Sequence, residues 1–245
     1  MKVIHISAKF KNKIKLSDSL IAYLKNQKIK SLALFASTQF TNLTEIKIQL
    51  KRQKIKILTA KLSRTNKQSQ ILGCDCYKSN FPDEIFSKSD AIIYIGDGMF
   101  HPKALLFSQL DSNEFKSVIS YNPISKKFTA LTKKDIEKQL KKTKQNLKAF
   151  IIAKKIGILV TTKPGQQFLN SALQLKKDLE KQGKKAFIFI DDNFDFSNFD
   201  NFSFVQIWVN TACPRIALDD ALYLEKPIIN LVDAFNPVKS LEKLN

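Results

Sequence analysis

Four residues that could ligate a metal or act as nucleophiles come after predicted strands. Cys74 and Cys76 follow an apolar run at 69–73, His101 follows a run at 91–96, and Cys213 follows a run at 204–210. Ligands of parallel α/β sheets bind outside the carboxyl ends of the strands. Cysteines serving only as small buried hydrophobes would have no reason to gather at that edge. We therefore interpret the four as a candidate site.

The residue types favour iron–sulfur chemistry over other metals. The chain has three cysteines, two histidines and no CxxC pair, so a histidine-rich zinc site is excluded. Cys213 is predicted at a helix N-terminus and Cys74 near one, and that dipole favours the thiolate that binds soft metals. A cysteine nucleophile would need a base, and His101 is the candidate because His5 falls inside a predicted strand.

Other polar residues follow predicted strands or open the next helix, among them Gln39, Asp97, Gln166 and Arg215. Simpler roles compete: Asp97 between two glycines could shape a turn, and His101 could bond backbone at a helix start. The chain has no GxGxxG or GxxxxGK[ST] pattern, which argues against a classical dinucleotide site or P-loop.

Short apolar runs alternate with helical patterns, which is typical of α/β units around parallel sheets. Strands are predicted at 2–7, 31–37, 54–58, 69–73, 91–96, 117–121, 155–162, 185–191, 204–210 and 227–232. Helices are predicted at 17–26, 41–52, 82–86, 101–110, 132–155, 165–181 and 213–224. We expect an α/β fold of two similar domains, 1–130 and 131–245, each a mostly parallel sheet flanked by helices. A basic helix opens the second domain.

The two halves read as copies of one unit. The segment from Leu32 aligns with the segment from Ile158, and 92–105 aligns with 206–218. In this alignment His101-Pro-Lys corresponds to Cys213-Pro-Arg, so His101 and Cys213 should begin matching helices. If the halves had different strand orders, the repeat would be an accident of composition.

Four strings resemble one family. They are QILGCDC (70–76), DAIIYIGDGMFHPKAL (90–105), VTTKPGQQF (160–168) and NTACPRIALDD (210–220), in this order. They resemble the diphthamide-synthesis family, the aminocarboxypropyl-histidine synthases, which are non-canonical radical S-adenosylmethionine enzymes. The resemblance runs from about residue 30 to about residue 235.

The resemblance implies three α/β domains that each donate one cysteine to a 4Fe-4S cluster. S-adenosylmethionine binds the open iron, and its aminocarboxypropyl radical adds to a histidine of translation elongation factor 2. Here Cys74 and Cys213 would hold the metal and should lie close together. The implied residues of the S-adenosylmethionine cleft are Gln39, Asp97, His101, Gln166 and Arg215.

The sequence also departs from the family. Residue 1 aligns with the start of the family's second domain, so the first domain and its cysteine are expected to be absent. Phe40 stands where the family's Thr-x-Gln-His loop has histidine. A homodimer or a family partner subunit could supply the third ligand, Cys76 could, or the protein no longer makes the radical. We expect Cys76 to diverge from Cys74, into the packing.

Composition leaves three readings open. With 245 residues, 44% hydrophobic, the chain is globular, and with no long apolar stretch or signal peptide we expect it in the cytoplasm, away from membranes. The leading hypothesis is a diphthamide-synthesis enzyme, and the alternative is a non-catalytic subunit or relic. The net charge of +19 suggests a nucleic-acid binder, but only three residues are arginine and no aromatic residues interleave the basic run.

Overall fold

A computed structural model describes residues 9–112 and 114–244 of the chain. The chain divides into two compact units, the first ending at Ile136 and the second beginning at Glu137. The predicted strand at 2–7, with His5, lies outside the described residues. No helix in the described ranges is both long and apolar enough to cross a membrane.

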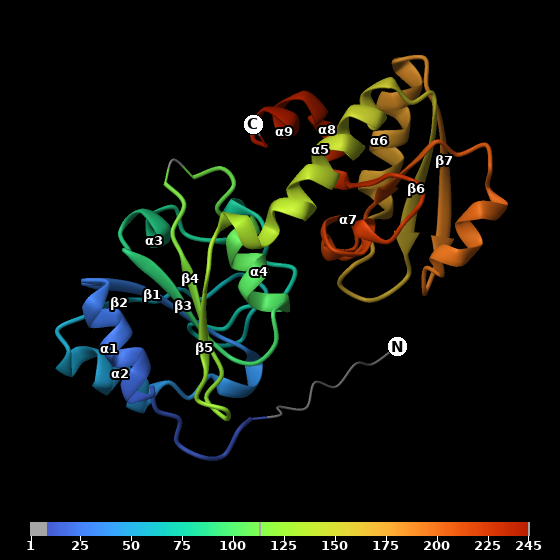
Figure 1. Cartoon of the computed structure of the whole chain (residues 1–245). Coiled ribbons are helices and arrows are strands. Elements are labelled where there is room, and N and C mark those ends of the chain that lie inside the picture. The colour runs from blue at the N-terminus through green and yellow to red at the C-terminus, as the bar shows by residue number, and fades with distance from the viewer. Residues whose placement is uncertain (1–8, 113, 245) are drawn as a thin grey trace. The chain divides into compact units, whose positions relative to one another are not determined.

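The first unit is a five-stranded sheet with helices on both faces (Figure 1). Its strands are β1 (Ser31–Ala36), β2 (Lys56–Leu58), β3 (Ala91–Ile95), β4 (Val118–Tyr121) and β5 (Phe128–Leu131), in the spatial order β2-β1-β3-β4-β5. All neighbours pair in parallel except β4 and β5. Its helices are α1 (Asp18–Asn26), α2 (Thr44–Arg52), α3 (Glu84–Ser87) and α4 (Phe100–Phe107).

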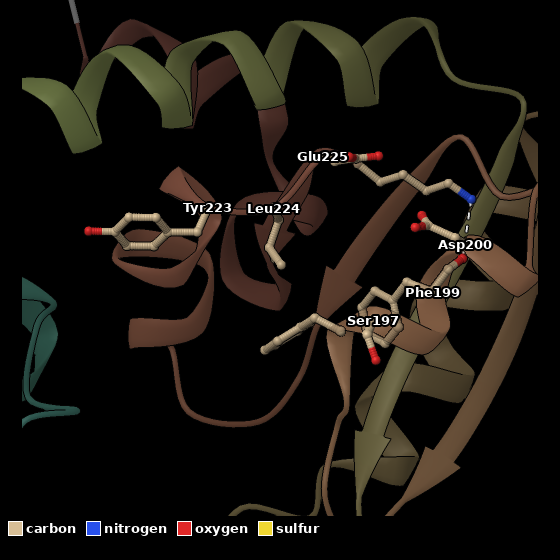
Figure 2. A pocket seen from close by; sticks show the side chains of 8 residues that line it. Ser197, Phe199, Asp200, Tyr223, Leu224 and Glu225 are labelled. Atoms are coloured by element: carbon tan, nitrogen blue, oxygen red, sulfur yellow. Dashed lines mark hydrogen bonds between the residues drawn. The ribbon is translucent and has the colours of Figure 1, made fainter.

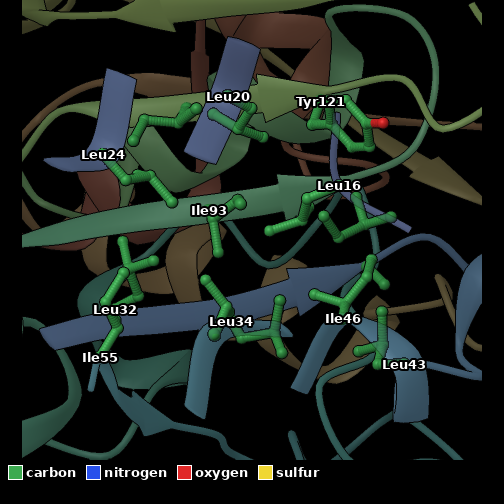
Figure 3. Packing of buried hydrophobic residues seen from close by; sticks show 14 of the residues in the cluster. Leu16, Leu20, Leu24, Leu32, Leu34, Leu43, Ile46, Ile55, Ile93 and Tyr121 are labelled. Carbon is green, nitrogen blue, oxygen red and sulfur yellow. The ribbon is translucent and has the colours of Figure 1, made fainter. Parts of the chain in front are cut away.

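Two amphipathic helices bury one face of this sheet. Leu20 and Leu24 of α1 and Ile46 and Leu50 of α2 recur at a spacing of four, so each pair lies on one side of its helix. These side chains are fully buried against alternate residues of β1 and β3, such as Leu34 (Figure 3). The strand runs are apolar throughout because both faces are covered.

The second unit is a four-stranded parallel sheet. Its strands are β6 (Lys155–Thr161), β7 (Lys185–Asp191), β8 (Ile207–Asn210) and β9 (Ile228–Asn230), in the order β7-β6-β8-β9. Its helices are α5 (Glu137–Ile152), α6 (Leu169–Lys181), α7 (Arg215–Leu218), α8 (Leu231–Phe235) and α9 (Pro237–Glu242). The lysine-coated α5 is the predicted basic helix, and its apolar side packs on the sheet through Leu147 and Phe150.

The predicted α/β class is confirmed, and the two sheets have one strand order, with β1, β2, β3 and β4 matching β6, β7, β8 and β9. The match extends to one side chain in each unit that accepts hydrogen bonds from the backbone N–H groups at the start of β1 or β6. Asp90 Oδ2 accepts the N–H groups of Lys30 and Ser31, each at 2.8 Å. Gln206 Oε1 accepts those of Lys154 and Lys155, at 2.7 and 3.0 Å. The repeat is therefore structural.

Three local predictions were wrong. The run at 69–73 forms only one bridge, Ala36 with Gln70, because Leu72 N–H bonds to Asp75 Oδ2 and Ser69 N–H bonds to the Ala60 carbonyl instead of to a neighbouring strand. The basic helix begins at Glu137 because the chain first returns along β4 as β5, through a turn in which the Asn122 side chain accepts two backbone N–H groups. The predicted helix at 213–224 divides at Asp219 into α7 and a 3₁₀ turn.

The matched residues Asp90 and Gln206 predict different effects of acid on stability, because the Asp90 carboxylate can be protonated and the Gln206 amide cannot. Burial raises the pKa of Asp90, but the N–H groups of Lys30 and Ser31 outweigh it and hold that pKa below its usual range. The contribution of Asp90 is thus present above the unfolded-state pKa of about 4 and is lost as the pH falls through the lower folded-state pKa.

Asp90→Ala should lower the free energy of unfolding by about 1 kcal/mol near neutral pH, since the carboxylate is exposed and screened. This cost should fade below about pH 4. Gln206→Ala, the matched control, should cost about the same at both pH values. Urea unfolding measures both, and an Asp90→Ala cost that does not change with pH would contradict the assignment.

Candidate functional site

Cys74 lies in a tight turn at the carboxyl edge of the first sheet. The buried carboxylate of Asp75 holds the turn, with Oδ2 accepting Leu72 N–H at 2.8 Å. Arg64 reaches the same turn, 3.4 Å from Asp75 Oδ1 and donating to the Cys74 carbonyl at 3.4 Å. The Cys74 backbone is therefore fixed while its side chain is half-buried. No helix begins there, so the expected helix dipole at Cys74 is wrong.

The loops bearing Cys74 and His101 touch each other. A Cβ on Gly73 would lie 1.8 Å from the ring of Phe100, so that ring packs directly on the glycine beside Cys74. His101 is the second residue of α4, and its ring stacks on Tyr94 with centroids 5.7 Å apart. This arrangement brings the thiol loop and the imidazole loop to one place in the first unit.

Tyr94 supports this edge from below. The residue is fully buried in β3, and a Cβ on Gly96 would lie 2.3 Å from its hydroxyl, so glycine is needed where the chain turns above the ring. Burial raises the pKa of Tyr94, the Ser37 hydroxyl opposes this, and the Asp97 charge adds to it. Tyr94 thus stays a neutral phenol beneath the His101 ring.

Gln39 and Asp97 complete the first unit's edge. Gln39 lies in a 3₁₀ turn, η1 (Thr38–Phe40), and both side chains are exposed. The side-chain amide of Gln70 donates to Thr38 Oγ1 at 3.0 Å, which ties η1 to the loop that leads to Cys74. The structure therefore brings Gln39, Cys74, Asp97 and His101 onto adjoining loops.

Two buried asparagines hold Cys213 at the matching edge of the second unit. Asn210 Nδ2 donates to the Cys213 carbonyl and to Asn230 Oδ1, both at 2.8 Å. Asn230 Nδ2 donates to the Pro214 carbonyl at 2.9 Å. The loop bearing Cys213 is thus held through its carbonyl groups, and the thiol side chain is half-buried.

The other two predicted residues of the second unit differ in exposure. Gln166 is half-buried in the turn after β6. Arg215 is 3% exposed and bonds through Nε to Asp219 Oδ2 at 2.6 Å. Its guanidinium braces α7, directly after the Cys213-Pro214 pair.

Each unit offers one half-buried cysteine as a candidate metal ligand. Cys74 and Cys213 are half-buried thiols outside any disulfide, whereas Cys76 is 2% exposed in the core, as expected. Within the described residues, no three His, Cys, Asp or Glu side chains group closely enough to hold a metal ion. Neither cysteine by itself has the companions that a metal ion needs within the described part of its own unit.

A separate hollow of about 220 Å³ lies in the second unit (Figure 2). Its walls include Phe196 and Phe199, together with Tyr223 and Lys226, which precede β9. Lys226 donates to the Phe199 carbonyl at 3.3 Å and so closes one side. Residues that lead into β9 lie at the amino edge of a parallel sheet, whereas Cys213 follows the carboxyl end of β8, so this hollow is not part of the cysteine site.

Sequence reasoning missed the residues that hold the two cysteines, namely Arg64, Asp75, Asn210 and Asn230. One signal was available. Asn210 and Asn230 each end an apolar strand run, and a polar side chain at the end of a buried strand needs a partner.

Comparison with known proteins identifies relatives over most of the chain. The family model described as "Putative diphthamide synthesis protein" matches residues 1–243. The 2-(3-amino-3-carboxypropyl)histidine synthase of Methanocaldococcus jannaschii is 31% identical over 172 residues, covering 69% of this chain and 46% of that protein. The synthase of Pyrococcus horikoshii is 29% identical, covering 68% and 44%, and subunit 1 from Dictyostelium discoideum is 28% identical, covering 67% and 34%.

Solved structures share the fold. The crystal structure of Dph2 from Pyrococcus horikoshii matches with a TM-score of 0.73 at 24% identity, covering 95% of this chain and 64% of that one. The same protein with a 4Fe-4S cluster matches with a TM-score of 0.69, covering 92% and 63%. The chain spans less than half the length of the curated relatives named above.

The asparagine pair predicts how Cys213 reacts. Asn210→Ala removes the donor to the Cys213 carbonyl and leaves buried groups unpaired, which should cost about 1–3 kcal/mol in the free energy of unfolding. The loosened loop should also let iodoacetamide alkylate Cys213 faster, as followed by peptide mass spectrometry. Asn201→Ala, at an exposed position, serves as the control. Equal alkylation rates in the two variants would refute a positioning role.

Proposed function

Because the chain belongs to the diphthamide synthesis protein family, we propose that it functions in diphthamide biosynthesis. The reaction transfers the 3-amino-3-carboxypropyl group of S-adenosylmethionine to a histidine of translation elongation factor 2. One observation carries the proposal. Each of the two structural repeats bears one half-buried cysteine in a loop at the carboxyl edge of its sheet, and side-chain hydrogen bonds fix the backbone of each.

Cys74 and Cys213 would hold a 4Fe-4S cluster, each as one thiolate ligand. When bound, the cluster would supply the electron for reductive cleavage of S-adenosylmethionine. The chain's own contribution is positioning. Arg64 and Asp75 hold the Cys74 turn, and Asn210 and Asn230 hold the Cys213 loop.

The remaining edge residues would bind substrate. Asp97 and His101 can pair with charged or polar groups of S-adenosylmethionine, and Gln39 and Gln166 can donate and accept hydrogen bonds. Arg215 is committed to Asp219, so we assign it to bracing the Cys213 loop. The third cluster ligand would come from a partner subunit of the family or a second copy of this chain, in the cytoplasm where elongation factor 2 acts.

Anaerobic reconstitution with iron and sulfide tests the ligand assignment. The unaltered chain should take up iron that a chelator removes readily, because two thiolates hold a cluster weakly. Cys74→Ser and Cys213→Ser should each lower the iron content, whereas Cys76→Ala, the matched control, should not. Iron lost only in Cys76→Ala would make Cys76 the third ligand. Iron uptake by none of the four proteins would favour the non-catalytic alternative.

The proposal also requires Cys74 and Cys213 to approach each other, although they belong to different units. Ligands of one cluster have sulfur atoms within roughly 7 Å, given metal–thiolate bonds of about 2.3 Å. A short bis-maleimide should therefore link Cys74 to Cys213 within one chain, as detected by peptide mass spectrometry. Linkage should fail in Cys213→Ser and persist in Cys76→Ala. Only intermolecular links in the unaltered chain would refute the shared site.

A further inference from the structure

A second hollow, of about 480 Å³, lies in the first unit and is not used by the proposed reaction. Three lysines, Lys9, Lys11 and Lys67, line it together with Phe10, Thr41 and Asn42. Among the described residues that line it, none is acidic. Its size falls within the range of about 300–1,000 Å³ that is typical of small-ligand sites.

Two segments that line the hollow, one with Lys67 and one with Phe10, are linked to η1 by hydrogen bonds. Gln70, 6% exposed, accepts the Lys67 N–H at 3.1 Å through Oε1 and donates to Thr38 Oγ1 at 3.0 Å. On the other wall Phe10 N–H donates to the Gln39 carbonyl at 3.0 Å. The rings of Phe10 and Phe40 lie 5.3 Å apart. The backbone segments that carry Lys9 and Lys67 are thus held on either side of one hollow, from which the exposed lysine side chains extend.

The ammonium groups in this hollow interact unfavourably with one another. A side-chain contact with Lys9 and the charge of Lys9 lower the pKa of Lys67, which is the direction expected when two cations are held close together. A concentrated negative charge placed between them would relieve this repulsion.

We propose that this hollow binds a nucleoside diphosphate, with its phosphates on the three lysines and its base against the Phe10 ring. Lysine binds phosphate as a compact point charge, whereas paired carboxylates favour the planar fork of arginine. A diphosphate places several charges within a small volume, which a single carboxylate cannot do. S-adenosylmethionine does not fit this chemistry, because its sulfonium is a cation. The inference is independent of the cysteine site.

Calorimetric titration of the full chain with ADP tests the proposal. Lys9→Gln and Lys67→Gln should each weaken ADP binding about tenfold, the effect of losing one hydrogen bond to a charged group. Lys51→Gln, which removes an exposed lysine of α2, should bind ADP as the unaltered chain does. Circular dichroism confirms that each variant is folded. Equal ADP affinity in all three variants would overturn the proposal.

Further ligands separate the parts of the proposal. Adenosine should not bind measurably, because it lacks the phosphates, and pyrophosphate should bind more weakly than ADP, because it lacks the base. Pyrophosphate binding as tight as ADP binding would overturn the contact with Phe10. A single-stranded RNA that binds through Lys9 and Lys67 while ADP does not would overturn a small-molecule site in favour of nucleic acid.

Discussion

Everything at the candidate site depends on the parallel pairing of the two central strands within each unit. β1 pairs with β3 from Leu32 opposite Ala91 to Ala36 opposite Ile95, and β6 pairs with β8 in the same sense. Parallel strands deliver their following loops to the same edge. The carboxyl edge of the first sheet receives Cys74 and His101, and that of the second sheet receives Cys213. The apolar strand runs, which are buried on both faces, therefore decide where these residues lie.

The strands that carry the site could be predicted because their apolar runs leave no other stable arrangement. The runs at 91–96 and 155–162 became β3 and β6 with ends shifted by one residue. The run at 69–73 looked similar but became a loop, since Leu72 N–H bonds to the Asp75 side chain and Ser69 N–H bonds to the Ala60 carbonyl. Side-chain hydrogen bonds of this kind compete with the ladder bonds of a strand, and an apolar run does not reveal them.

The cysteines could be picked out by residue type and position, but the partners of their backbone groups could not be assigned. Arg64 is ten residues from Cys74, and Asn230 is 17 residues from Cys213, so no local pattern links these pairs. The internal repeat was the one relation between distant segments that the sequence revealed. It correctly paired the loop of His101 with the loop of Cys213, because both halves conserve the strand order that puts these loops in matching places.

The two units fix their cysteine-bearing loops by different chemistry. The Cys74 turn uses an ion pair whose arginine side chain is 43% exposed and whose aspartate is buried, whereas the Cys213 loop uses neutral amides that are fully enclosed. Salt screens an exposed charge but not a buried amide pair. Salt therefore weakens the contacts that hold the Cys74 turn more than those that hold the Cys213 loop. Because a different polar group donates to the carbonyl of each cysteine, the two loops share a fixed cysteine backbone rather than any particular side chain around it.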